Sequence, residues 1–265
     1  MMGKKKKEKK KWYTNRSTAI VFIVLRILII VTVVLSILRR DYESAFIAVF
    51  TFFLLLLPSI LSRRLHIILP SVLEIIILCF IFAANILGEI NNFYVRVPHW
   101  DTLLHTINGF NFAAIGFALV GMLNRSKKVS LNLSPLFLAI VAFCFSMTIG
   151  VMWEFYEYTA DRMLVLDMQK DTVIHEFNTV ELDRTKDNVP IQVRDISDVI
   201  IVHSDGSREP LGLGGYLDVG IHDTMKDLLV NMIGAVIFSL IGYFYVKQEG
   251  KGKFASSFIP RVDYE

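Results

Sequence analysis

The feature that most constrains this chain is a series of long apolar blocks. The block from Thr18 to Leu38 is apolar on every side of a helix except at Arg26. About 20 apolar residues in helical form cross the hydrocarbon of a bilayer, and a helix that is apolar all round belongs in lipid. Because hydrophobic residues make up 54% of the chain, an ordinary water-soluble fold is excluded. We expect an all-α integral membrane protein.

Six segments meet the length requirement, so we expect six transmembrane helices. They cover residues 18–38, 44–62, 66–88, 102–123, 134–160 and 223–246. The predicted organisation is a basic N-terminus over 1–17, five helices within 18–160, an insertion over 161–222, a sixth helix over 223–246 and a tail over 247–265.

The distribution of Lys and Arg predicts the orientation. With the N-terminus inside, the termini and short loops place seventeen of these residues on the cytoplasmic side and three on the other. Positive residues favour the cytoplasmic side, so we expect a multi-pass cell-membrane protein with both termini cytoplasmic. The basic run before Trp12 and Tyr13 also suggests nucleic-acid binding, but interfacial aromatics favour a topology anchor. The lipid bilayer is therefore the expected partner, and nucleic acid is not.

The connection over 162–222 carries eleven Asp and Glu against six Lys and Arg. A β-branched run from Ile196 to His203, the turn residues Asp205-Gly206 and a second run from Ser207 to Leu213 predict a hairpin. We expect a small β-rich extracytoplasmic insertion between the fifth and sixth helices. Disorder is the competing interpretation.

Polar side chains gather at the predicted outer ends of the last three spans. Residues three or four apart share a helix face, and each span presents one such face. The residues are Asp101, His105, Asn108 and Asn111, then Glu154, Glu157 and Asp161, then Asp223, Asp227 and Asn231. Helix capping by Asp101 or Asp223 and interhelical hydrogen bonding are the structural alternatives. Ionisable groups within a membrane are functional by default, so we favour a binding or catalytic pocket.

Several carboxylates in one pocket need a positive charge beside them. A divalent cation with oxygen ligands and one imidazole is the simplest source, and proton sharing is the alternative. The predicted metal ligands are Asp101, His105, Glu154 and Asp227. The predicted catalytic residues are Glu157, as the base, and Glu154. The remaining predicted pocket residues are Asn108, Asp223 and Asn231.

A second pair of charges lies at another depth. Arg26 in the first span and Glu74 in the third fall in the predicted cytoplasmic half. We expect a buried ion pair between them with a structural role.

Three motifs carry a resemblance to a known family. They read Trp100-Asp101-x-x-x-His105-x-x-x-Gly109, Gly150-x-x-Trp153-Glu154-x-x-Glu157 and Asp223-x-x-x-Asp227-x-x-x-Asn231-x-x-Gly234-Ala235. The pattern resembles the YjdF-like family of bacterial inner-membrane proteins and, more distantly, VanZ-like proteins. The likeness covers the last three spans by motif and the first three by hydropathy alone, and the 162–222 insertion departs from it because YjdF-like members have a shorter acidic connection. The resemblance implies a fold and the place of a site, and it implies no reaction.

Three functions are compatible with such a pocket. The first is a metal-binding protein that hydrolyses or modifies an envelope or lipid-linked substrate at the outer surface. The second is a transporter or ion pathway with an acidic vestibule, and the third is a membrane scaffold or sensor. The polar faces give way to apolar residues and Gly toward the cytoplasm. This pattern favours a pocket that ends within the membrane, and therefore the first function.

Overall fold

The computed structural model describes residues 16–64, 67–124, 133–250 and 252–262. Within them, six helices are long and apolar enough to cross a membrane, which confirms the predicted number of spans. They cover Arg16–Leu38, Tyr42–Arg64, Ser71–Ile90, Trp100–Gly121, Pro135–Leu164 and Ile221–Lys247. The basic run over 4–11 and the aromatic pair after it lie outside the described residues.

The second span consists of two helices, α2 (Tyr42–Leu54) and α3 (Leu57–Arg64). The break follows from Pro58, because proline has no N–H and its ring clashes with the carbonyl four residues earlier. That carbonyl belongs to Leu54, the last residue of α2. A tight turn at Arg40 joins α1 (Arg16–Leu38) to α2, and Asp41 caps α2 by accepting the Ser44 N–H at 3.0 Å.

The third span changes its helix type partway along. α4 (Ser71–Phe82) continues into a π-helical segment, η1 (Ala83–Ile90), and a short helix, α5 (Phe93–Arg96), follows. The N–H of Asn91 bonds to the carbonyl of Ile86, five residues back, at 3.1 Å. π-helical turns are rare in proteins, and those that occur are often found at functional sites.

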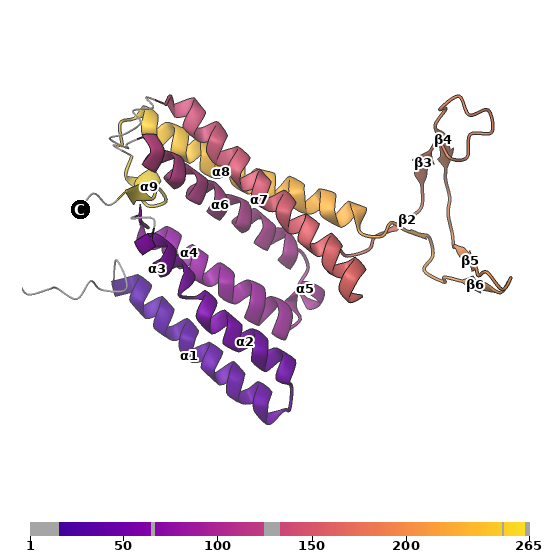
Figure 1. Ribbon diagram of the computed structural model, residues 1–265, viewed down its shortest axis with the longest axis horizontal. Helices are drawn as coiled ribbons and strands as arrows, with labels where there is room; N and C mark the ends of the chain where they lie inside the picture. Colours follow the sequence, from indigo (N-terminus) through magenta and orange to yellow (C-terminus); the bar gives the residue numbers. More distant parts are fainter. Residues whose placement is uncertain (1–15, 65–66, 125–132, 251, 263–265) are drawn as a thin grey trace, which may run out of the picture. The chain divides into compact units, whose positions relative to one another are not determined.

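The last three spans are α6 (Trp100–Asn124), α7 (Pro135–Leu164) and α8 (Ile221–Lys247). The chain forms two compact units, Met1–Gly150 with Leu228–Glu265, called here the membrane unit, and Val151–Asp227, called the insertion unit. Both α7 and α8 run unbroken through the boundary (Figure 1).

Two apolar clusters hold the membrane unit together. One packs α1, α2, α4 and η1 around Phe22, Ile29 and Leu78. The other packs α6, α7 and α8 around Phe117 and Phe238. The opposite sides of the helices remain apolar and open, as at Ile23 and Ile27, which are each 55% exposed. An apolar outer surface of this kind fits contact with lipid.

The insertion unit carries three short antiparallel strand pairs, which confirms the strand-containing insertion before the last helix. The pairs are β2 (Val173–Ile174) with β7 (Tyr216–Leu217), β3 (Phe177–Thr179) with β4 (Ile191–Val193), and β5 (Ile200–Val202) with β6 (Arg208–Pro210). The last pair is the predicted hairpin, and Gly206 takes the positive φ of 85° that its turn requires.

The C-terminal tail folds back on the membrane unit, which the sequence did not reveal. After α9 (Lys253–Ser256), strand β8 (Arg261–Val262) pairs antiparallel with β1 (Ile67–Ile68). Ile259 is buried in the cluster of α6, α7 and α8.

Candidate metal-binding site

Two glycines bring α6 and α8 into backbone contact. A Cβ added to Gly234 would lie 1.9 Å from the carbonyl oxygen of Thr106, and one added to Gly109 would lie 2.0 Å from that of Asn231. Small residues at such positions allow membrane helices to pack closely. The close contact at these glycines therefore fixes where α6 and α8 cross, next to the predicted site residues.

α7 joins this crossing through three contacts around Asn231. Ser146 Oγ donates to the Gly109 carbonyl at 2.7 Å, and Asn231 Nδ2 lies 3.6 Å from Met147 Sδ. A Cβ on Gly150 would lie 2.6 Å from Asn231 Nδ2. Asn231 is 1% exposed, and its Oδ1 has no hydrogen-bond partner within the described residues. Leaving a buried amide oxygen without a hydrogen bond costs free energy. Asn231, a predicted pocket residue, is therefore a polar group whose hydrogen bonds are incomplete in a tightly packed place.

Asp101 and His105 meet as the sequence predicts. They are one turn apart on α6, and His105 Nε2 lies 3.5 Å from Asp101 Oδ1. The imidazole is buried at 8% exposure, and Asp101 is partly open. A carboxylate beside a ring nitrogen orients the imidazole.

Asp227 is one turn from Asn231 on α8 and is 1% exposed. The boundary between the two units falls directly after it, inside the unbroken helix that Asn231 and Gly234 anchor on α6. One ligand atom from each of Asp101, His105 and Asp227 lies within 4.8 Å of the others, so this group could hold a metal ion. Glu154, the fourth predicted ligand, is not part of the group.

A lysine that is not among the predicted site residues lies beside these acids. Lys226 Nζ lies 2.7 Å from Asp223 Oδ1 and 3.7 Å from Asp227 Oδ1, and its side chain is about half exposed. The signal was present, because Asp223 and Lys226 are three residues apart and share a helix face. Part of the positive charge that the carboxylates need therefore comes from the protein itself.

Glu154 and Glu157 lie on the part of α7 that belongs to the insertion unit. Both are buried, at 4% and 8% exposure, and Trp153 Nε1 donates to Glu157 Oε1 at 2.8 Å. Their burial shows that neither side chain is a solvent-exposed surface charge. On α6, Asn108 is half-buried and Asn111 is buried.

Asp161 and Asp223 have a structural task. The N–H groups of Met168 and Gln169 donate to the Asp161 carboxylate at 2.6 and 2.9 Å, and the N–H of Lys170 donates to Asp223 at 2.9 Å. These carboxylates fix the segment that leaves α7.

The helix cap considered for Asp223 falls to a different residue. Asp218 accepts the N–H of His222 at 2.8 Å and that of Thr172 at 2.6 Å. Its position three residues before α8 satisfies an otherwise open N–H of the first turn.

The predicted pair of Arg26 and Glu74 stays a prediction. The guanidinium of Arg26 lies over the rings of Phe52, at 3.8 Å, and Phe22, at 4.8 Å. Such cation–π contacts accommodate a charge in an apolar surrounding. Glu74 is buried on α4.

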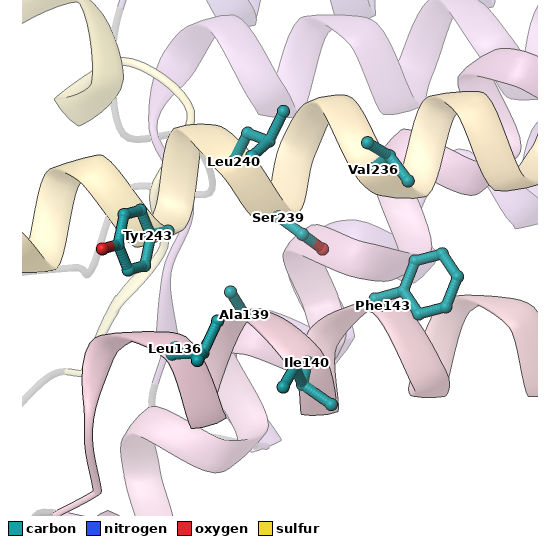
Figure 2. Close-up of a pocket in the computed structure, with 8 residues that line it drawn as sticks. All are labelled: Leu136, Ala139, Ile140, Phe143, Val236, Ser239, Leu240 and Tyr243. Atoms are coloured by element: carbon teal, nitrogen blue, oxygen red, sulfur yellow. The ribbon is translucent and has the colours of Figure 1, made fainter.

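A groove between α7 and α8 lies away from the carboxylates. Figure 2 shows it between α7 and α8, with a volume of about 360 Å³ and a lining of apolar side chains apart from Ser239 and the tip of Tyr243. Ser239 follows Asp227 by twelve residues, which is about 18 Å along a helix. The groove therefore belongs to the lipid-facing surface and not to the polar group.

The fold and the polar group define a class: a helical protein with six candidate spans and an Asp, His and Asp cluster at the meeting of its last helices. Residues 20–248 match the family described as "Predicted membrane protein (DUF2238)", and the chain belongs to this family. It is the YjdF family, in line with the resemblance seen in the motifs. An "Uncharacterized protein" of Thermotoga maritima is 27% identical over 107 residues, which cover 40% of this chain and 53% of that protein. The chain thus matches about half the length of that relative. No solved structure matches this chain.

Proposed function

We propose that this protein binds a divalent cation through Asp101, His105 and Asp227. The observation that carries the proposal is the grouping of three ligand atoms within 4.8 Å, two of them on nearly buried side chains. Metal–ligand bonds of about 2.0–2.2 Å need only a modest contraction of such a group. One imidazole with two carboxylates suits Zn²⁺ or Mn²⁺, whereas Mg²⁺ and Ca²⁺ favour oxygen ligands alone.

Lys226 offsets part of the negative charge of the carboxylates and still leaves Asp227 available to a metal ion. Its ammonium is nearer to Asp223 than to Asp227, at 2.7 against 3.7 Å. A metal would therefore compete with the longer of the two contacts. Proton sharing among these acids and the imidazole is the alternative explanation, and it predicts no stabilisation by added metal.

The finer parts of the proposal rest on the sequence pattern. Glu154 would add a fourth ligand, and Glu157 would act as the base on an envelope or lipid-linked substrate. Asn108, Asp223 and Asn231 would line the pocket. The excess of Lys and Arg near both termini supports a cell-membrane protein with cytoplasmic termini and an extracytoplasmic insertion. The likeness to VanZ-like proteins is supported by the motifs alone.

Ligand-linked stability tests the cation directly. Chelator-treated protein in detergent should melt at a higher temperature when Zn²⁺ or Mn²⁺ is added, since a ligand at 100 times its Kd stabilises by about 2.7 kcal/mol. His105→Gln should remove this shift. Asp161→Asn is the matched control, because Asp161 lies outside the group, and it should keep the shift. Equal metal shifts in wild type and His105→Gln would refute the proposed ligands.

A further inference from the structure

A second, polar cavity lies where α1 ends, far along the sequence from the carboxylates of α7 and α8. It has a volume of about 200 Å³ and lies between the last turns of α1, the turn before α2 and the end of η1. Its polar lining consists of Thr32, Ser36, Arg39, Asp41 and Asn91. Because two candidate spans end here, at Leu38 and at Ile90, we place the cavity at the level where lipid headgroups begin.

The cavity offers a cation with no partner of its own. The Arg39 guanidinium makes no hydrogen bond or ion pair with any residue in the described ranges, although its charge contributes to Asp41. A planar guanidinium matches the oxygens of a phosphate in two parallel hydrogen bonds.

The same cavity offers a group of acceptors. Asp41 accepts the Ser44 N–H through Oδ1 to cap α2, and the two oxygens of a carboxylate have acceptor sites for further donors. Asn91 donates its Nδ2 to the Ile86 carbonyl, so its Oδ1 is the open end of the amide. The Thr32 hydroxyl donates to the Leu28 carbonyl at 3.0 Å and can only accept from a ligand. These oxygens suit an ammonium group.

The Asp41 carboxylate is ionised at neutral pH. Hydrogen bonds from Ser44 lower the pKa of Asp41 below its ordinary value, and the charge of Arg39 contributes. The turn that holds Arg39 and Asp41 is strained, because Arg40 between them has φ of 59°. Non-glycine residues in this conformation persist only where the surroundings impose it, and they collect at ligand sites.

We propose that this cavity binds the phosphoethanolamine headgroup of a membrane lipid. The phosphate pairs with Arg39, and the ammonium is held by Asp41 and Asn91. A zwitterion satisfies both charges, whereas a purely anionic headgroup would face the Asp41 carboxylate. A choline headgroup has no N–H to donate to these oxygens.

Lipid titrations followed by native mass spectrometry of the full-length protein test the proposal. Phosphatidylethanolamine should bind about tenfold more tightly than phosphatidylglycerol or phosphatidylcholine with the same acyl chains, the size of one charge-assisted hydrogen bond. Asp41→Asn keeps a good helix cap, and it should abolish this preference and improve phosphatidylglycerol binding. Arg39→Gln should weaken both phosphatidylethanolamine and phosphatidylglycerol about tenfold.

Arg40→Gln is the matched control, because it removes the same charge from the same turn outside the cavity lining. It should leave the lipid preference unchanged. In a second arm, soluble phosphoethanolamine is added to delipidated protein. Binding of the lipid alone assigns the site to the membrane, and binding of both assigns it to the headgroup chemistry from either source. Equal affinity of wild type for the three lipids, or an unchanged preference in Asp41→Asn, would overturn the proposal.

Discussion

At the scale of single residues, spacing along the sequence predicted which side chains share a helix face, but it did not predict contacts between different helices. Asp101 and His105, like Asp227 and Asn231, are four apart, and a helix alone places each pair on one face. The partners Lys226 and Met147 were not foreseen. Nor was the position of Arg26 over two phenylalanine rings. Such contacts depend on which helix is the neighbour and on how each helix is rotated about its axis. A helix that is apolar on all sides gives no indication of either.

The tight crossing of α6 and α8 gives a prediction at this scale. Gly234→Ala and Gly109→Ala should each destabilise the protein by about 1–3 kcal/mol, the cost of overpacking, because the added methyl group would meet backbone oxygen. Thermal unfolding in detergent measures the loss. Gly121→Ala is the control on the same helix, since no atom lies within 4 Å of its added Cβ, and it should melt at or above the wild-type temperature. A control-like melting temperature for Gly234→Ala would contradict the described crossing.

At the scale of elements, the sequence predicted where spans lie but not how two of them are built. Pro58 sits within the predicted second span, and the apolar length that defined the span does not show the break that this proline causes. The π-helical end of the third span leaves the apolar pattern almost unchanged, so hydropathy gave no sign of it. The strand pairs of the insertion were foreseen only where a two-residue turn marked them.

Asp218 links one of these strand pairs to the start of α8. Its side chain is 1% exposed. Burial alone would raise the pKa of Asp218, but hydrogen bonds from Thr172, His222 and Gly220 outweigh it and lower the pKa below the ordinary 3.8. The stabilisation is therefore complete above pH 3.8 and is lost as the pH falls through the lowered folded-state pKa.

Hydrogen exchange checks this expectation. At neutral pH, Asp218→Asn should exchange faster than wild type in peptides covering 170–176 and 216–222, because the charge-assisted bonds are weakened. The difference should shrink once the pH drops below the lowered pKa and wild-type Asp218 is protonated. A difference that persists unchanged into strong acid would show that Asp218 acts by shape alone.

At the scale of the whole molecule, length and composition predicted six spans because the bilayer sets a minimum apolar length. The return of the C-terminal tail to pair with β1 could not be predicted, since a two-residue strand has no periodic signature. The orientation follows from the bias of Lys and Arg and stays a prediction.

Cysteine labelling tests that orientation. In a background with Cys79 and Cys144 replaced by Ala, we expect a membrane-impermeant maleimide to label Asp187→Cys in intact cells. Lys253→Cys should react only after the membrane is opened, because the predicted tail is cytoplasmic. Both positions are exposed, so access and not burial decides the outcome. The reverse pattern would invert the proposed topology and move the insertion to the cytoplasm.

The central claim is a cation held by Asp101, His105 and Asp227, and elemental analysis of the purified full-length protein tests it most directly. Wild type and Asp161→Asn, prepared in parallel without chelator, should carry about one equivalent of a transition metal such as zinc or manganese. Asp227→Asn, which keeps the shape of the side chain and removes its charge, should carry far less. Metal-free wild type after growth with added zinc and manganese, or equal metal in wild type and Asp227→Asn, would contradict the account.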